Sequence, residues 1–250
     1  QLTSAVETVA KDDTHASASS AMTELYDDGA DYVVKGSFGT ATASVSAGAD
    51  ARDVARTFNL LSGTTGISAS VVSKAQVKID TAGTVSFTLQ GKSADKSTVN
   101  ATVSDVSDLT ALKDAINAVG GQTGIVASLT EDLSGVNITQ EEGYDIIIGD
   151  VAAAAGDMTV RGQNADGSFQ AGAAVALDMD STAGDSTSVV GHVTLSSHKA
   201  FTVTPGHANN MFSGATTAEN STLSTIGNVN LKDQSGATKA IAVIDAAMAQ

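Results

Sequence analysis

The period of apolar and polar positions changes along the chain and separates helical from β-rich parts. Residues 1–28 carry apolar residues at near-helical spacing, which predicts a helical lead-in segment. From residue 29 onward, short apolar runs alternate with Gly, Ser, Thr and Asp, a texture typical of strands and turns. Near the end, over 237–250, helical spacing returns. The apolar positions there are Ile241, Ile244, Ala247 and Met248.

Two stretches read as β-hairpins. Residues 31–38 alternate and face a second alternating run over 40–46, and residues 84–90 face 97–104 in the same way. Gly36 and Gly91 lie near the two turns, where a permissive backbone helps the chain reverse.

An internal repeat is the most informative feature of the sequence. A shift of 58 residues aligns 43–70 with 101–128 without a gap, and 11 of the 28 pairs are identical. For a chain this rich in Ala, Ser, Thr and Gly, roughly 2–3 identities would arise by chance, so duplication is the better explanation. The identical pairs are Ala43/Ala101, Val45/Val103, Ser46/Ser104, Asp50/Asp108, Asn59/Asn117, Gly63/Gly121, Thr65/Thr123, Gly66/Gly124, Ile67/Ile125, Ala69/Ala127 and Ser70/Ser128.

Each copy reads as a strand, a capped helix and a second strand. Asp50 and Asp108 stand where an N-cap would accept the free amides of the helix. Gly63 and Gly121 are expected to end the two helices, and alternating strands are expected over 65–70 and 123–128. The apolar helix faces are Val54, Phe58 and Leu61 in the first copy and Leu109, Leu112, Ile116 and Val119 in the second.

These patterns predict an α+β fold made of several small modules, each an antiparallel sheet covered by a short helix. A β-rich third segment follows the modules, and helical segments are expected at both chain ends. The predicted segments are 1–28 (helical lead-in), 29–82 (first β-α-β module), 83–150 (second β-α-β module), 151–222 (β-rich) and 223–250 (return to helix).

Composition narrows the classes of function. The formal net charge is −15, which disfavours nucleic acid and anionic membranes as partners. The absence of Cys excludes disulfides, thiol catalysis and Cys-based metal sites. No apolar stretch approaches the roughly 18 residues of a membrane span. The chain opens without Met and stops within a helical pattern, so we expect it to be a piece of a longer protein.

Motifs for nucleotide binding, for zinc proteases and for a nucleophile elbow are absent from the sequence. His192, His198 and His207 could hold a metal only if they converged, and surface positions are the better interpretation. The acidic pairs Glu131-Asp132 and Glu141-Glu142 are read as solvated turns. We therefore expect no catalytic, cofactor-binding or metal site.

Asp178, Asp180 and Asp185 are spaced somewhat like a calcium loop. The EF-hand pattern counted from Asp178 requires Gly at 183 and Glu at 189, where Ala183 and Val189 stand, so a solvated turn is favoured and a bound ion is left open. Asn100, Asn137 and Asn220 begin N-glycosylation sequons, a pattern that often occurs by chance.

The repeat resembles a motif of a known family. The pairs Phe58-Asn59 and Ile116-Asn117, followed by Gly and by Thr-Gly-Ile-x-Ala, are similar to the IN motif in the variable outer domains of bacterial flagellins. Residues 223–231 and 240–250 resemble the start of the flagellin C-terminal region, and 191–203 resembles a β segment of the variable region. Two separate parts of the chain thus carry the resemblance.

The resemblance implies a structural subunit of the flagellar filament that supports swimming motility. The family's long terminal helices are missing here, so the chain would be the surface-exposed outer region, secreted and displayed on the filament. Implied partners are other flagellin subunits and O-linked glycans on exposed Ser or Thr. No cofactor is expected, and the 250-residue chain alone should be monomeric.

Three alternatives stay open. A hook-associated or filament-cap protein can carry related modules. A surface adhesin or carbohydrate-binding module normally needs exposed aromatic platforms or a metal site, and the chain has only six Phe and three Tyr. An enzyme ranks last, because it would need a convergent cluster of titratable residues.

Overall fold

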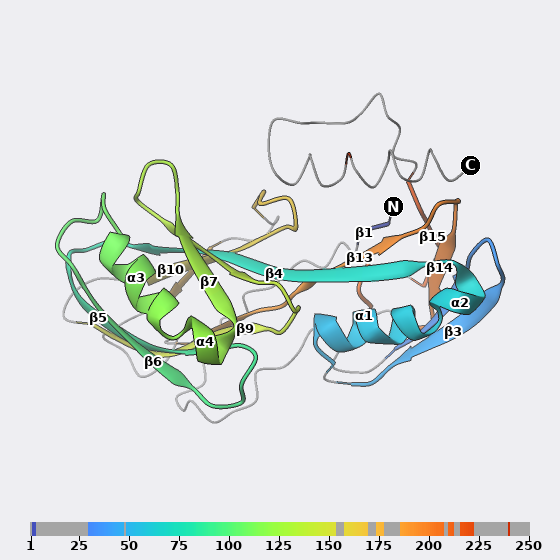
Figure 1. Ribbon diagram of the computed structural model, residues 1–250, viewed down its shortest axis with the longest axis horizontal. Helices are drawn as coiled ribbons and strands as arrows, with labels where there is room; N and C mark the ends of the chain where they lie inside the picture. Colours follow the sequence, from blue (N-terminus) through green and yellow to red (C-terminus); the bar gives the residue numbers. More distant parts are fainter. Residues whose placement is uncertain are drawn as a thin grey trace.

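The computed structural model describes residues 2–3, 30–47, 49–153, 158–169, 174–177, 186–207, 210–212, 216–222 and 240. Within these residues the chain forms two lobes joined by one long strand, β4 (Ser68–Ile79), which crosses both in Figure 1. The lobe on the right is called the first lobe and the lobe on the left the second lobe.

Both lobes consist of antiparallel strands and short helices, in agreement with the predicted fold class. The helices are α1 (Ala51–Leu60), α2 (Ser62–Thr65), α3 (Thr110–Ala118) and α4 (Gly120–Thr123). The other described strands are β1 (Leu2–Thr3), β2 (Ala30–Lys35), β3 (Thr40–Val45), β5 (Gly83–Gln90), β6 (Ser97–Val103), β7 (Ile125–Leu129), β8 (Val136–Gln140), β9 (Ile146–Ala153), β10 (Met158–Gln163), β11 (Val175–Leu177), β12 (Thr187–Val189), β13 (His192–Ser196), β14 (Thr202–Pro205) and β15 (Glu219–Asn220).

The described strands form three sheets. One has the order β15-β14-β2-β3, a second has the order β12-β9-β5-β6, and the third runs β1-β13-β4-β10-β11 with β8 joining β4 to β7. Both predicted hairpins are confirmed, since β2 pairs with β3 and β5 pairs with β6. Every described strand pair is antiparallel.

Strand β4 changes partners along its length. From Ser68 to Val72 it pairs with β13, and from Ser73 onward it pairs with β8 and with β10. The first half therefore belongs to the first lobe and the second half to the second lobe.

Two separate hydrophobic clusters fill the lobes. The first-lobe cluster draws its buried residues from 32–67 and again from 190–212. The second-lobe cluster draws its buried residues from 75–189. The residues of the second lobe therefore lie in sequence between the two segments that form the first lobe. The predicted segments 29–82, 83–150 and 151–222 stay predictions, and residues of the last of them enter both clusters.

Each longer helix packs against strands of two different sheets. α1 packs against β3, β4 and β13, and α3 packs against β6 and β7. The predicted apolar faces point inward, with Val54 and Phe58 buried on α1 and Leu112 and Ile116 buried on α3. Full burial of such a side chain stabilises the fold by about 1.5–3 kcal/mol.

Contacts of α1 and β4 with the turn after β8 hold the two lobes together. The backbone N–H of Arg52, at the start of α1, donates to the carbonyl of Gly143 at 3.2 Å. The Ser73 hydroxyl of β4 donates to the carbonyl of Tyr144 at 2.7 Å. The guanidinium of Arg52 also lies 4.5 Å from the centre of the Tyr144 ring. The turn after β8 is therefore tied to the first lobe.

The predicted helical chain ends fall mostly outside the described residues. Leu2 and Thr3 form a strand that pairs with β13, where a helix was predicted, because the sheet edge supplies partners that a local pattern does not contain. The rest of the lead-in segment is outside the described residues. Within 223–250, Ala240 alone is described. No helix in the described part of the chain is long and apolar enough to cross a membrane.

The first-lobe cluster predicts a strong difference between two neighbouring positions of α1. Phe58 is 1% exposed and its ring centroid lies 5.8 Å from that of Tyr32, whereas Leu60 is 78% exposed. Phe58→Ala should lower the free energy of unfolding by about 3–5 kcal/mol, because it leaves a cavity. Leu60→Ala, the matched control, should change it by less than about 0.5 kcal/mol. Urea denaturation measures both, and equal effects would contradict the assigned helix face.

Candidate functional site: the repeated helix–turn–strand unit

The two copies found in the sequence adopt the same local structure. In the first copy α1 is followed by the short helix α2, then by Gly66 and β4, and in the second copy α3 is followed by α4, Gly124 and β7. The short helices α2 and α4 are offset by the same 58 residues as the sequences. The order of helix, short helix, left-handed glycine and strand is therefore shared by the two copies.

A buried threonine fixes the turn in each copy. The Thr65 hydroxyl donates to the carbonyl of Leu61 at 2.9 Å and accepts from the N–H of Ile67 at 3.3 Å. The Thr123 hydroxyl makes the equivalent bonds to Val119 and Ile125, each at 3.2 Å. Each threonine is 1% exposed, and its hydroxyl gives the N–H of the residue two positions later, Ile67 or Ile125, a partner inside the turn.

An asparagine near the end of each longer helix binds the strand that follows. The Asn59 side chain donates to the carbonyl of Ala69 at 2.9 Å and accepts from the N–H of Ala69 at 2.8 Å. The Asn117 side chain makes the same two bonds to Ala127, also at 2.9 and 2.8 Å. These are the asparagines of the Phe-Asn and Ile-Asn pairs.

The helices end at different glycines from those predicted. Gly63 and Gly121 lie inside α2 and α4, and the left-handed residues are Gly66, with φ +73°, and Gly124, with φ +70°. The prediction was wrong because an extra helical turn follows each longer helix before the chain reverses. The strands accordingly begin at Ser68 and Ile125, later than expected.

Gly36 and Gly91 have a role that turn formation does not explain. A Cβ atom on Gly36 would lie 1.8 Å from the Thr65 carbonyl oxygen, and one on Gly91 would lie 2.5 Å from that of Thr123. Both distances are shorter than real Cβ contacts allow. Each hairpin therefore packs its glycine directly against the turn of its own copy, a long-range contact that sequence alone does not reveal.

The two predicted N-caps differ. Asp50 accepts from the N–H of Asp53 at 2.8 Å and caps α1 as expected, and burial raises its pKa. Asp108 is not the N-cap, because buried Leu109 takes that position and donates its N–H to the carbonyl of Leu133 at 3.0 Å. The Asp108 carboxylate instead accepts from the hydroxyl and N–H of Thr110, which lower its pKa.

Comparison with known proteins supports the resemblance to flagellins. A family model described as the flagellin hook IN motif matches residues 84–142, which include the second copy. The B-type flagellin of Pseudomonas aeruginosa strain PAO1 is 34% identical over 142 residues. That match covers 55% of this chain and 28% of the flagellin.

A solved structure of the D1-D2-D3 domains of the flagellar cap protein FliD from Escherichia coli is also similar in part. It covers 53% of this chain and 55% of that chain at 13% identity, with a TM-score of 0.21. A TM-score this low carries no argument about the fold. The chain spans well under two thirds of the curated flagellin and of this structure.

The three described histidines show no common site. His192 is buried in β13, whereas His198 and His207 are exposed in the segments that follow β13 and β14. No group of three or more His, Cys, Asp or Glu side chains suited to a metal ion occurs among the described residues. Asp178, Asp180 and Asp185 lie outside the described residues, so the solvated turn expected there stays a prediction.

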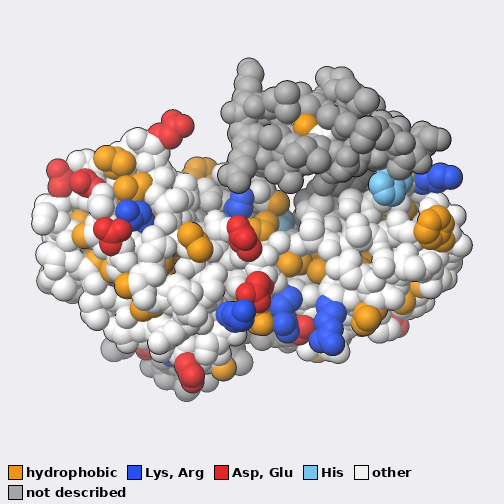
Figure 2. Space-filling model, viewed as in Figure 1, with side chains coloured by type: hydrophobic (Ala, Val, Ile, Leu, Met, Phe, Trp, Pro, Cys, Tyr) orange, Lys and Arg blue, Asp and Glu red, His pale blue; other side chains and the backbone are white. Residues whose placement is uncertain are grey.

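The predicted acidic turns are present and have structural partners. Glu131 and Asp132 lie in the exposed turn between β7 and β8, and Glu141 and Glu142 follow β8. Glu142 forms an ion pair with Lys92 at 2.7 Å. Figure 2 shows Lys and Arg beside Asp and Glu side chains between the lobes, on a surface that is mostly uncharged.

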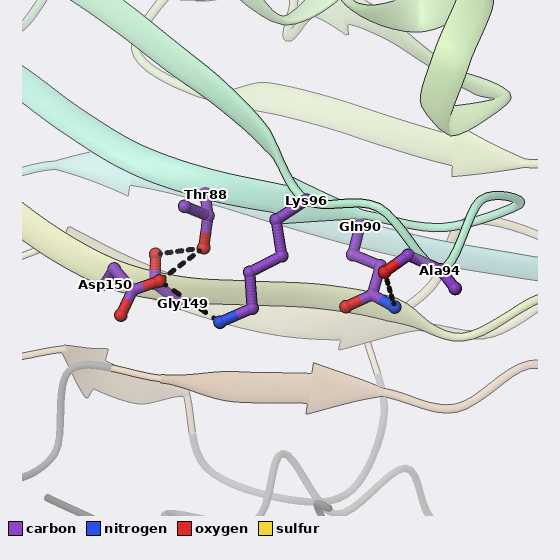
Figure 3. A network of polar contacts seen from close by, with 6 residues as sticks. All are labelled: Thr88, Gln90, Ala94, Lys96, Gly149 and Asp150. Carbon is purple, nitrogen blue, oxygen red and sulfur yellow. Dashed lines mark hydrogen bonds and ion pairs between the residues drawn. The ribbon is translucent and has the colours of Figure 1, made fainter. Parts of the chain in front are cut away.

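A polar network in the second lobe supports an irregular strand (Figure 3). The pairing of β5 with β9 shifts register between Ser86 and Thr88, and Asp150 in β9 has a φ of +51°. Thr88 donates to the Gly149 carbonyl at 2.9 Å and to the Asp150 carboxylate at 3.1 Å, and Lys96 lies 3.2 Å from the same carboxylate. An ion pair this exposed contributes at most about 1 kcal/mol. The network therefore stabilises the bulge locally.

The sequon asparagines occupy different settings. Asn100 on β6 and Asn220 on β15 are exposed. Asn137 on β8 is partly buried, and its side-chain oxygen accepts from Gln76 at 3.2 Å and from Gln163 at 3.3 Å. Asn137 is therefore engaged in the sheet surface and is poorly placed to carry a sugar.

The left-handed glycines predict a contrast within one short helix. Gly66→Ala should destabilise the chain by about 1 kcal/mol or more, because Ala at φ +73° is strained. Gly63→Ala, three residues earlier, meets nothing within 4 Å and should stabilise by about 0.5–1 kcal/mol. Thermal and urea unfolding would compare them, and the reverse order would restore Gly63 as the terminating residue.

The turn between β7 and β8 contains a carboxylate, Asp132, whose pKa is lowered. Hydrogen bonds from the hydroxyls of Thr130 and Ser134, at 2.6 and 2.7 Å, lower the pKa of Asp132 to about 2. This pKa lies below the unfolded value of about 3.9, so the carboxylate contributes stability above that pH. The contribution is lost as pH falls through about 2.

The NMR chemical shift of the Asp132 carboxyl carbon, followed as a function of pH, should therefore show a titration midpoint near pH 2. Ser134→Ala removes one donor and should raise the midpoint. A midpoint near the unfolded value of about 3.9 in the unsubstituted chain would contradict the hydrogen-bonded turn.

Proposed function

We propose that this chain is the surface-exposed outer region of a bacterial flagellin, a structural subunit of the flagellar filament. The observation that carries the proposal is the match of residues 84–142 to the flagellin hook IN motif, together with 34% identity to a B-type flagellin over 142 residues. Because that match covers only part of the relative, assembly into a filament is inferred for the longer protein.

The first copy is proposed to be a second IN-type module. The bonds of Asn59 and Thr65 repeat those of Asn117 and Thr123, atom for atom. Phe58 replaces Ile116 at an equally buried position, which preserves the apolar contact of the helix.

In this proposal the modules are displayed outside the cell on the filament and support swimming as structural parts, without catalysis. Their partners are neighbouring flagellin subunits, with O-linked glycans on exposed Ser or Thr. A net charge of −15 gives the displayed surface a repulsive character that limits sticking between filaments. Neither nucleic acid nor a membrane is a partner, and the 250-residue chain alone is monomeric.

The alternatives receive less support from the described surface. An adhesin that binds sugars would use adjacent exposed aromatics, but exposed Phe38 follows β2 in the first lobe and exposed Phe169 follows β10 in the second. A hook-associated or cap protein would share the IN motif, and its position on the organelle would distinguish it from a filament subunit.

Immunogold electron microscopy of cells of the source organism tests the proposal directly. Antibodies raised against the purified 250-residue chain should label flagellar filaments along their whole length. Antibodies preadsorbed with the same chain are the control. Gold confined to the filament tip or the hook junction would favour the hook-associated or cap alternative, and gold on the cell body alone would favour an adhesin.

A further inference from the structure

One edge of strand β7 has no neighbour among the strands that the structure describes. Among the described strands, β7 pairs with β8 alone. Its sequence, Ile125–Leu129, carries no charge, and Val126 on it is 63% exposed. An uncharged, β-prone edge of this kind can pair with another chain where its outward N–H and C=O groups are open. Of these groups, the N–H of Ile125 is bound by the Thr123 hydroxyl at 3.2 Å, and both groups of Ala127 are bound by the Asn117 side chain.

The first half of β4 presents the same situation in the first lobe. Ala69 faces Leu195 of β13, yet its N–H and C=O bond to Asn59, so they point away from β13. The N–H and C=O of one strand residue point to the same side, which makes Ala69 a non-hydrogen-bonded pair with Leu195 and places both groups on the outer edge. Ala127 of β7 is placed in the same way by Asn117.

We propose that Asn59 and Asn117 are edge plugs, whose side-chain amides occupy the hydrogen-bonding place of a neighbouring strand and prevent strand addition by a second copy of this chain. Asparagine suits the task because its amide offers a C=O acceptor and an N–H donor on the same side, as the N–H and C=O of a single strand residue do. A neighbouring strand would bind Ala127 through those same two backbone groups.

A second copy is the occupant that each plug excludes. An antiparallel edge can pair with an identical edge, because both carry the same alternation of donors and acceptors. Ile125–Leu129 has no like charges to oppose such pairing. The same contact occurs in both lobes, near the end of the longer helix of each copy.

The proposal does not rest on the flagellar function. A plugged edge would serve any secreted or assembled protein held at high local concentration. Failure of the immunogold experiment would leave the plugs untouched, and failure of the test below would leave the proposed function untouched.

The test removes one plug from the full 250-residue chain and measures self-association. Asn117→Ala should shift the chain toward dimers and larger species in sedimentation velocity over a concentration series. Its Ala127 amide should exchange with solvent on the order of five- to tenfold faster in dilute solution, where association is absent. Asn100→Ala, which removes an exposed asparagine from β6 in the same lobe, should change neither measurement.

A rescue variant separates edge pairing from general damage. Val126→Lys places a charge on the exposed side of β7 and should return the Asn117→Ala chain to the parent's sedimentation, because an edge lysine opposes strand pairing. Association that persists in the double variant would overturn the proposal. Unchanged sedimentation of Asn117→Ala together with faster exchange of the Ala127 amide would also overturn the proposal. Asn117 would then serve only to bind the end of α3 to β7.

The first lobe supplies an independent version of the test. If Asn117→Ala loses its far-ultraviolet circular dichroism, Asn59→Ala is measured instead, with Ser70→Lys on β4 as its rescue. Association of Asn59→Ala that Ser70→Lys reverses supports the proposal. Association that is not reversed, or none at all, overturns it.

Discussion

The shared strand β4 is the constraint on which the arrangement of the lobes depends. Its 12 residues extend over about 40 Å, with the first half paired to β13 and the second to β8 and β10. A slip of one residue would turn every inward side chain of β4 toward solvent in both lobes at once. The register of one lobe therefore fixes the register of the other, and the ties from Arg52 and Ser73 to the turn after β8 add to this coupling.

Each copy of the repeat covers the open edge of a strand with few residues. A sheet edge that is left open exposes both apolar side chains and backbone polar groups, and a single helix laid along it covers the first but not the second. Phe58 and Ile116 supply the apolar cover, whereas Asn59 and Asn117 satisfy the backbone groups. The adjacent pair of residues thus combines two functions at one turn of helix, and both functions occur together in each copy of the repeat.

Local features of this fold could be predicted from the sequence, and long-range ones could not. The hairpins, the Asp50 cap and the buried helix faces follow from alternation, helical period and cap chemistry, all of which act within a few residues. The caps at Asp108 and Gly63 were mispredicted because burial of Leu109 and one extra helical turn moved the boundaries. The pairing of β4 with β13 joins residues more than 100 positions apart, and no local period records it.

The strands nearest the two ends of the described chain belong to the same lobe. β1 near the start and β15 near the end of the described chain both join sheets of the first lobe, whereas residues 75–189 build the second. A region attached to a filament at both of its ends would hold the first lobe nearer the attachment and the second farther out. The module matched by the flagellin family model, residues 84–142, lies in that second lobe. In the proposed filament the coupling through β4 would then transmit the orientation of the attached lobe to the outermost one, so that a flexible linker between the copies is not needed.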